Sequence, residues 1–276
     1  MRLKIALIIG QAIGLKCLKY ISENKNIDLK YVACNDERYI KITKKICKDK
    51  EIFFFKEFNK DFIIKEKLDE FFLLNILSKK IIKENVLNRF KDCFNVHPAI
   101  LPQYPGINPI SGMIFNKEKN IGVTIHKMTG KVDAGEIILV SKTSINLNDN
   151  LLSCTKKIEG LTKKILIKFL NKLAKGKKVR TFSNNNKKKK FFPKKIPNYG
   201  LLDFTWDFKK FLRYFNAGFS GPYNSEWGKL YFNYLEEKKT INSFKISKKN
   251  IEKKILQIDK NNYCLKLKDK TIVVST

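Results

Sequence analysis

The stretch MRLKIALIIGQAIGLKCLKYISENKNIDLKYVAC (residues 1–34) decides the fold class of this chain. Apolar runs cover Lys4–Ile9 and Leu29–Ala33, and apolar residues at helical spacing fill Leu15–Glu23 between them. A strand, a helix and a second strand in succession predict parallel pairing. A short signal peptide is the alternative, but its apolar core, Ile5–Ile9, precedes no small-residue cleavage site, so we expect a first strand that runs into a glycine turn.

The same alternation continues to about residue 140. A helix is predicted at Tyr39–Lys48, and a long amphipathic helix at Leu151–Leu173 is expected to close the domain. Further strands are predicted at Glu70–Leu74, Cys93–Val96, Gly122–His126 and Glu136–Ser141. The pattern predicts the α/β class, with a Rossmann-like, mostly parallel sheet that helices cover on both faces.

The composition changes after residue 173. Residues 174–200 combine Lys and Asn runs with two prolines and lack a period, which indicates a solvated linker; a tRNA-binding arm is the alternative. We therefore expect a catalytic domain at 1–180, a basic linker at 181–199 and a small C-terminal α+β domain at 200–276. The elements predicted for the last part are a helix at Phe208–Phe215 and strands at Ile255–Ile258, Tyr263–Leu267 and Thr271–Val274.

The charge is strongly positive but comes mainly from lysine. The chain has 57 Lys and Arg against 26 Asp and Glu, a net charge of +31, yet five of the basic residues are Arg. Proteins that read bases or clamp phosphates favour the bidentate fork of Arg. Many Lys and Asn with little Ala or Arg indicate an AT-rich coding bias instead, so we do not expect a nucleic-acid partner.

Membrane and disulfide classes are not favoured either. No apolar run approaches the ~20 residues of a membrane helix, so we expect a soluble, cytoplasmic protein without a membrane partner. The six cysteines show no CxxC pair, which excludes a zinc-finger spacing and predicts buried, reduced thiols.

The segment NVHPAILPQYPGINPISGMIFNKEKNIGVTIHKMTGKVDAGEII (residues 95–138) carries the chemistry. Asn95 and His97 lie at the carboxyl end of a predicted strand, where open α/β sheets bind ligands. His97 can act as a general base near neutral pH, Asp133 in a glycine-flanked turn can orient it, and Asn95 can donate to a developing oxyanion. The residues alone also allow a capping Asn and a His bonded to backbone.

The motifs NVHPAILPQYPG, GVTIHKM and KVDAGEII resemble the signature of the folate-dependent formyltransferases, and the chain looks closest to those that act on sugar nucleotides. The resemblance implies transfer of a formyl group from 10-formyltetrahydrofolate to an amine. It makes Asn95 the oxyanion donor, His97 the base-like partner of the amine, and Asp133 the group that orients His97 and receives a proton.

The resemblance also places the co-substrate. LLNILSKKII (Leu73–Ile82) resembles the strand-end loop that cradles the pterin with backbone groups. The folate-binding candidates are Leu77, Ser78, Ile82, Lys131 and Val132. One departure is that Pro105-Gly106 stands where many relatives have Arg-Gly. No metal is expected, because the motif lacks the three or four well-placed ligands of a transition-metal site.

The expected acceptor is a dTDP-, UDP- or GDP-linked amino deoxysugar for surface glycans such as lipopolysaccharide O-antigen. Its candidate contacts are Gly10, Gln103, Tyr104, Asn108, Arg213, Tyr223 and Asn224. Tyr223 and Asn224, after a Gly-Pro turn, could present an aromatic face and an amide to a nucleobase. A homodimer through the C-terminal domain is compatible with the resemblance.

Three alternatives stay open. The first alternative acceptor is glycinamide ribonucleotide. An enzyme for it would need a glycine-rich loop after the first strand to bind the phosphate, whereas that loop reads IIGQAIG here. Methionyl-tRNA formyltransferases, the second alternative, usually carry Met at the position of His126 and a larger C-terminal barrel. The third is an RNA-binding module. His126 can be a core histidine bonded to backbone or a residue of the sugar-enzyme motif.

Overall fold

The computed structural model describes residues 2–58, 66–146, 148–177, 179–184, 192–193, 196–221 and 227–276. It divides into two compact units, which we describe separately. The first comprises Met1–Gly106, Gly122–Thr143 and Lys157–Phe191, and the second comprises Ile107–Ile121, Ser144–Lys156 and Phe192–Thr276. The predicted domain boundaries around the basic linker stay a prediction.

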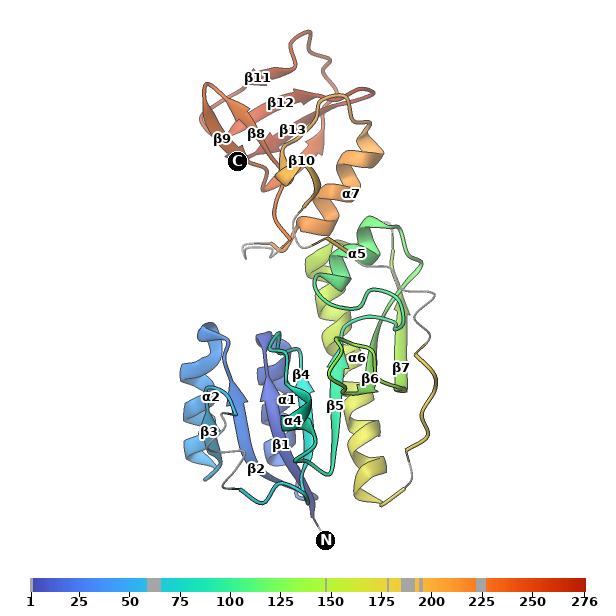
Figure 1. Ribbon diagram of the computed structural model, residues 1–276. Coiled ribbons are helices and arrows are strands. Elements are labelled where there is room, and N and C mark those ends of the chain that lie inside the picture. The colour runs from blue at the N-terminus through green and yellow to red at the C-terminus, as the bar shows by residue number, and fades with distance from the viewer. Residues whose placement is uncertain are drawn as a thin grey trace. The chain divides into compact units, whose positions relative to one another are not determined.

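A seven-stranded sheet forms the centre of the first unit (Figure 1). Its strands follow the order β3-β2-β1-β4-β5-β6-β7. The pairs from β3 to β5 are parallel, and β6 runs antiparallel to β5. The strands are β1 (Leu3–Ile9), β2 (Ile27–Cys34), β3 (Phe53–Phe55), β4 (Phe72–Ile76), β5 (Asp92–His97), β6 (Asn120–Lys127) and β7 (Ile137–Ser144). The predicted α/β class with a mostly parallel sheet is confirmed.

Apolar side chains alternate along the strands and build a core on each face of the sheet. Ala6 and Ile8 of β1 belong to a buried cluster with Tyr31, Leu73 and Cys93. On the other face, Phe94 packs edge-on against Phe169, with 4.9 Å between the ring centroids.

The helices are α1 (Gln11–Glu23), α2 (Glu37–Asp49), α4 (Glu84–Leu87) and α6 (Leu151–Ala174). Because side chains alternate, Asn95 and His97 lie on the face of Cys93, opposite Phe94.

The proline-rich loop after β5 leads into a helix that the sequence pattern did not predict. α5 (Pro109–Phe115) has proline in its first turn, where a missing N–H costs no intrahelical bond. β3 was also missed, because three consecutive phenylalanines lack the alternation of a longer strand.

The second unit is an α+β arrangement, as expected. α7 (Phe208–Gly218) buries Phe211 and Tyr214, and its phenylalanines pack edge-to-face against Phe244 of β10. The strands are β8 (Tyr231–Tyr234), β9 (Glu237–Thr240), β10 (Ser243–Ile246), β11 (Ile255–Gln257), β12 (Asn262–Lys266) and β13 (Thr271–Ser275). They form a four-stranded antiparallel sheet, β10-β13-β12-β11, and a separate β8-β9 hairpin.

All six cysteines are buried thiols, as predicted. Burial raises the pKa of Cys17, Cys47 and Cys93 to about 12, so none of these three is a reactive thiolate near neutral pH. Within the described part of the chain, no helix has the length and apolar character to cross a membrane.

Candidate active site

The register of three neighbouring strands brings three polar residues into one row. Asn75 of β4 pairs with Asn95 of β5, and Asn95 pairs with His126 of β6. His97, two residues after Asn95, pairs with Thr124. Cross-strand partners place their side chains on the same face of a sheet. The row therefore lies where the parallel strands end, which is the ligand-binding edge of open α/β folds.

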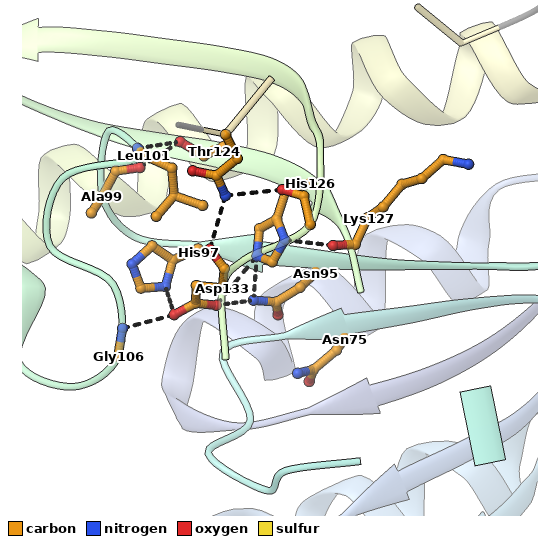
Figure 2. A network of polar contacts seen from close by, with 12 residues as sticks. Asn75, Asn95, His97, Ala99, Leu101, Gly106, Thr124, His126, Lys127 and Asp133 are labelled. Carbon is orange, nitrogen blue, oxygen red and sulfur yellow. Dashed lines mark hydrogen bonds and ion pairs between the residues drawn. The ribbon is translucent and has the colours of Figure 1, made fainter. Parts of the chain in front are cut away.

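Asp133 joins this row from the turn before β7 and is its central acceptor (Figure 2). Its Oδ2 accepts a hydrogen bond from the Gly106 amide at 2.8 Å and lies 3.3 Å from His97 Nδ1. Its Oδ1 accepts from Asn95 Nδ2 at 3.1 Å and lies 3.3 Å from His126 Nε2. The three residues that the sequence marked as catalytic are thus brought together around one carboxylate.

The ring of His97 is fixed by backbone. Its Nε2 donates to the Tyr104 carbonyl at 2.8 Å, so Nδ1 faces Asp133. The side chain is 5% exposed. Burial lowers the pKa of His97 below its ordinary 6.5, and the charge of Asp133 opposes that shift only in part. When only Nε2 carries a proton, Nδ1 is the atom of His97 at which a second proton can be taken up, beside the carboxylate.

Asp133 stays ionised although it is buried. Burial raises the pKa of its carboxyl group, but the His97 ring, the His126 ring and the Gly106 amide together lower it well below the ordinary 3.8. The carboxylate also accepts amide hydrogen bonds from Gly106 and Asn95. The site thus combines a carboxylate, an imidazole and an amide donor, as general acid–base catalysis requires.

His126 is a member of this cluster, which the core interpretation of the sequence missed. Its Nδ1 donates to the Lys127 carbonyl at 2.7 Å, as that interpretation expected, but its Nε2 faces Asn95 Nδ2 at 3.0 Å. With the proton on Nδ1, the ring accepts from Asn95 through Nε2. Both Nδ2 hydrogens of Asn95 are therefore engaged, one by His126 and one by Asp133. The feature that reveals this role is the pairing of His126 opposite Asn95, and strand register cannot be read from the sequence.

Asn184, from the segment predicted as a solvated linker, holds the turn that carries Asp133. Its Nδ2 donates to the carbonyls of Asp133 and Gly135, both at 2.9 Å. Two residues earlier, Phe182 pairs with Ile137 at the start of β7. Asp133 has a φ of 45°, in the left-handed region that non-glycine residues rarely adopt. Asn184 therefore stabilises a strained turn at the site.

Replacing Asn184 with alanine is expected to lower kcat about tenfold with little change in KM, since each lost hydrogen bond is worth about 0.5–1.5 kcal/mol. The looser turn should also shift the pH profile of kcat, which depends on the distance between Asp133 and His97. Steady-state kinetics from pH 5 to 9 measure both effects. Ser183→Ala is the control, because this neighbouring side chain is exposed. An unchanged pH profile for Asn184→Ala would contradict the assignment.

The predicted folate loop lies against the predicted glycine turn. Leu77 has a φ of 54°, and a Cβ at Gly10 would meet the Leu77 carbonyl oxygen and, at 2.8 Å, Ser78 Cα. Gly10 also donates its amide to Ile76 at 2.9 Å. Ile82 packs against the core cluster of that face. The loop is thus packed tightly against the glycine, and its role in folate binding stays a prediction.

Gly10→Ala is expected to displace the Leu77–Ser78 backbone, lower stability by about 1–3 kcal/mol and weaken folate binding. Thermal unfolding and titration with 5-formyltetrahydrofolate measure these two effects. Gly160→Ala is the matched control, since a Cβ at Gly160 meets nothing within 4 Å and alanine favours a helix. If Gly10→Ala has the unfolding temperature and the folate affinity of the wild type, the contact between Gly10 and the Leu77–Ser78 backbone contributes to neither property.

The remaining residues predicted to contact the folate or the acceptor differ in burial and in hydrogen bonding. The Lys131 amide and carbonyl both bond to the Thr129 hydroxyl, and Val132 is 51% exposed. Tyr104 is buried, so its carbonyl rather than its ring serves the site, through His97. Gln103 lies in a turn, with its amide bonded to Ile100. Asn108 precedes α5 and Arg213 lies in α7, both in the second unit. Tyr223 and Asn224 lie outside the described residues.

Among the residues that the structure describes, no group of three or more His, Cys, Asp or Glu side chains is arranged to hold a metal ion. An amide donor beside a paired carboxylate and imidazole is a set of groups typical of enzymes that stabilise a tetrahedral oxyanion.

A comparison with protein families agrees with that class. The chain belongs to the formyl transferase family, whose model matches residues 31–170. A methionyl-tRNA formyltransferase from Thermotoga maritima is 40% identical over 98 residues, covering 35% of this chain and 31% of the relative. A bifunctional polymyxin resistance protein ArnA from Wigglesworthia glossinidia brevipalpis is 32% identical over 204 residues, covering 70% and 30%. The chain thus spans about a third of the length of these curated relatives.

The same fold occurs in solved structures over the whole length of the chain. The crystal structure of WlaRD, a sugar 3N-formyl transferase in the presence of dTDP and 5-N-formyl-THF, superposes with a TM-score of 0.71 at 19% identity. The superposition covers 100% of this chain and 98% of WlaRD. At this identity the comparison establishes the fold.

Proposed function

We propose that this protein transfers the formyl group of 10-formyltetrahydrofolate to the amino group of a nucleotide-linked amino sugar. The observation that carries the proposal is the buried cluster of Asn95, His97 and Asp133 at the carboxyl ends of the strands. The location we propose is cytoplasmic, and the product would serve surface glycans. The proposed folate contacts are at Leu77–Ile82, where the backbone of Leu77 and Ser78 lies against Gly10.

The chemistry assigns one task to each side chain. The acceptor amine attacks the formyl carbon, a C–N bond forms and the formyl oxygen becomes an oxyanion, which Asn95 Nδ2 stabilises. His97 and Asp133, whose Nδ1 and Oδ2 atoms lie 3.3 Å apart, together take up the proton that the amine loses. The bond from the formyl carbon to N10 then breaks, and that proton is delivered to N10. No net proton is consumed.

The state of Asn95 adds a condition to this scheme. Its two Nδ2 hydrogens bond to His126 and Asp133, at 3.0 and 3.1 Å. The bond to the His126 ring is the one to be exchanged for the oxyanion as charge develops on the formyl oxygen, because the Asp133 carboxylate is already a charged acceptor. Because a charged acceptor forms a stronger hydrogen bond than a neutral one, that exchange favours the transition state over the ground state.

Two observations favour a sugar nucleotide over the other acceptors. The fold of WlaRD, a sugar enzyme by its description, matches this chain along almost its entire length. Histidine at position 126 is also the residue expected of the sugar enzymes. The nucleotide would be dTDP, UDP or GDP. A homodimer through the C-terminal domain belongs to this proposal as well.

Methionyl-tRNA is the second candidate acceptor. The identity of 40% over 98 residues to a methionyl-tRNA formyltransferase favours it, and the net charge of +31 suits a polyanionic partner. Histidine at position 126 favours it less.

One assay distinguishes the candidates. Purified protein and 10-formyltetrahydrofolate are offered nucleotide-linked amino sugars, glycinamide ribonucleotide and charged initiator tRNA in parallel, and products are detected by mass spectrometry as the gain of one formyl group. We expect formylation of an amino sugar that His97→Ala abolishes. Formylation of methionyl-tRNA alone would support the second candidate, and no transfer to any acceptor would contradict the proposal.

A further inference from the structure

Asn75 is a buried amide at the centre of the sheet edge, and the catalytic scheme does not use it. It is 4% exposed and lies in register beside Asn95, on the same face of β4 and β5 (Figure 2). Its Nδ2 reaches the Ser78 carbonyl at 3.5 Å, the outer limit of a hydrogen bond. Its Oδ1 has no hydrogen-bond partner among the residues that the structure describes.

A buried acceptor without a partner weakens a fold, and leucine of similar size would avoid that loss. Thr43 shows the usual situation in the same unit, because this fully buried hydroxyl donates to the Tyr39 carbonyl at 2.7 Å. Asn75 departs from that rule at a position between the catalytic Asn95 and the predicted folate loop. A polar atom kept unsatisfied at such a place indicates a partner that arrives with the ligand.

The chemistry of the partner follows from the orphan atom. A carboxamide oxygen only accepts, so the incoming group must be a donor. Neither Asn95 nor His126 can supply it, since the Asn95 hydrogens and the His126 Nδ1 hydrogen are already engaged. The ligands of the proposed function both carry N–H groups close to the reacting carbon: the reduced pterin and the acceptor amine.

We propose that Asn75 Oδ1 is a ligand-binding atom that accepts a hydrogen bond from an N–H group of a bound substrate. The inference rests on the proposed function and adds to it a residue that fixes the orientation of one reactant. Asn95 then meets the formyl oxygen from one strand, while Asn75 holds an N–H from the neighbouring strand. A purely structural asparagine would have used its oxygen within the fold.

Asn75→Leu tests the proposal because it separates binding from stability. Removal of a buried unsatisfied acceptor should leave the unfolding temperature unchanged or raise it, while kcat/KM for one substrate falls about tenfold. A larger loss toward 10-formyltetrahydrofolate identifies the pterin as the donor, and a larger loss toward the amino sugar identifies the amine. Asn75→Asp, which keeps an acceptor oxygen, should recover part of the lost kcat/KM.

Thr43→Val is the matched control, since it removes a buried polar group that is satisfied. It should lower the unfolding temperature and leave kcat/KM unchanged for both substrates. If Asn75→Leu instead behaves like Thr43→Val while wild type remains active, the assignment of Asn75 is wrong and the proposed function stands. If wild type itself neither binds 5-formyltetrahydrofolate nor transfers formyl groups, the proposed function and this inference are both overturned.

Discussion

Asn95→Ala is expected to lower kcat about 10²–10³-fold, equivalent to ~2.7–4 kcal/mol of transition-state stabilisation. Alanine removes the N–H donor that would meet the formyl oxygen. It also leaves His126 Nε2 and Asp133 Oδ1 each without one hydrogen bond. Single-turnover formylation, followed by mass spectrometry at saturating concentrations of both substrates, measures the loss without a contribution from product release.

The control for this variant is ligand binding. The candidate folate contacts lie at Leu77–Ile82 and Lys131–Val132, so titration with 5-formyltetrahydrofolate should give nearly the wild-type affinity. His126→Gln is an informative companion, because its side-chain oxygen can still accept from Asn95 but cannot take up a proton. If Asn95→Ala keeps near wild-type turnover, the oxyanion role is wrong.

Asp133→Asn is expected to lower kcat by about 10²–10⁴-fold, the range typical of a lost proton-transfer partner. Burial lowers the pKa of His97, and the Asp133 charge opposes that shift. Without the charge, the pKa of His97 should fall further, so the acid limb of the kcat profile should move to lower pH. A rate profile from pH 4.5 to 9 measures the displacement. Movement to higher pH would contradict the coupling.

The same shifts predict how stability depends on pH. The pKa of Asp133 is lowered in the folded chain, so its contribution is fully present above the ordinary 3.8 and is lost as the pH falls below it. The pKa of His97 is also lowered, so the unfolded chain binds that proton more tightly, and stability declines as the pH falls from 6.5. Asp133→Asn should remove the first dependence and retain the second. Unfolding temperatures measured from pH 7 to 3 test this difference.

The losses in kcat caused by Asn95→Ala and by Asp133→Asn should each combine less than additively with the loss caused by His97→Ala. All three side chains act on one proton and one oxyanion, so removing His97 makes the Asp133 interaction irrelevant. A double variant that loses the full product of the two single effects would indicate independent roles.

Local sequence was sufficient for the α/β class. Lys4–Ile9 and Leu29–Ala33 are apolar enough to be buried on both faces, and parallel strands require that. The motif also predicted that Asn95, His97 and Asp133 act together, and the structure brings these side chains close to one another. Their catalytic roles stay a prediction. The helix at Pro109–Phe115 was missed because a proline that starts a helix resembles a proline that stiffens a loop.

The sequence by itself determined which residue types were present at the strand ends; only the tertiary structure decided their partners. Strand register places Asn75 and His126 on either side of Asn95, although 20 and 31 residues separate them from it along the chain. Asn184 reaches Asp133 from 51 residues away, out of a stretch whose composition resembles a linker. Composition and periodicity report burial and local geometry. A hydrogen bond between distant residues depends on register and chain crossing, which are properties of the whole sheet.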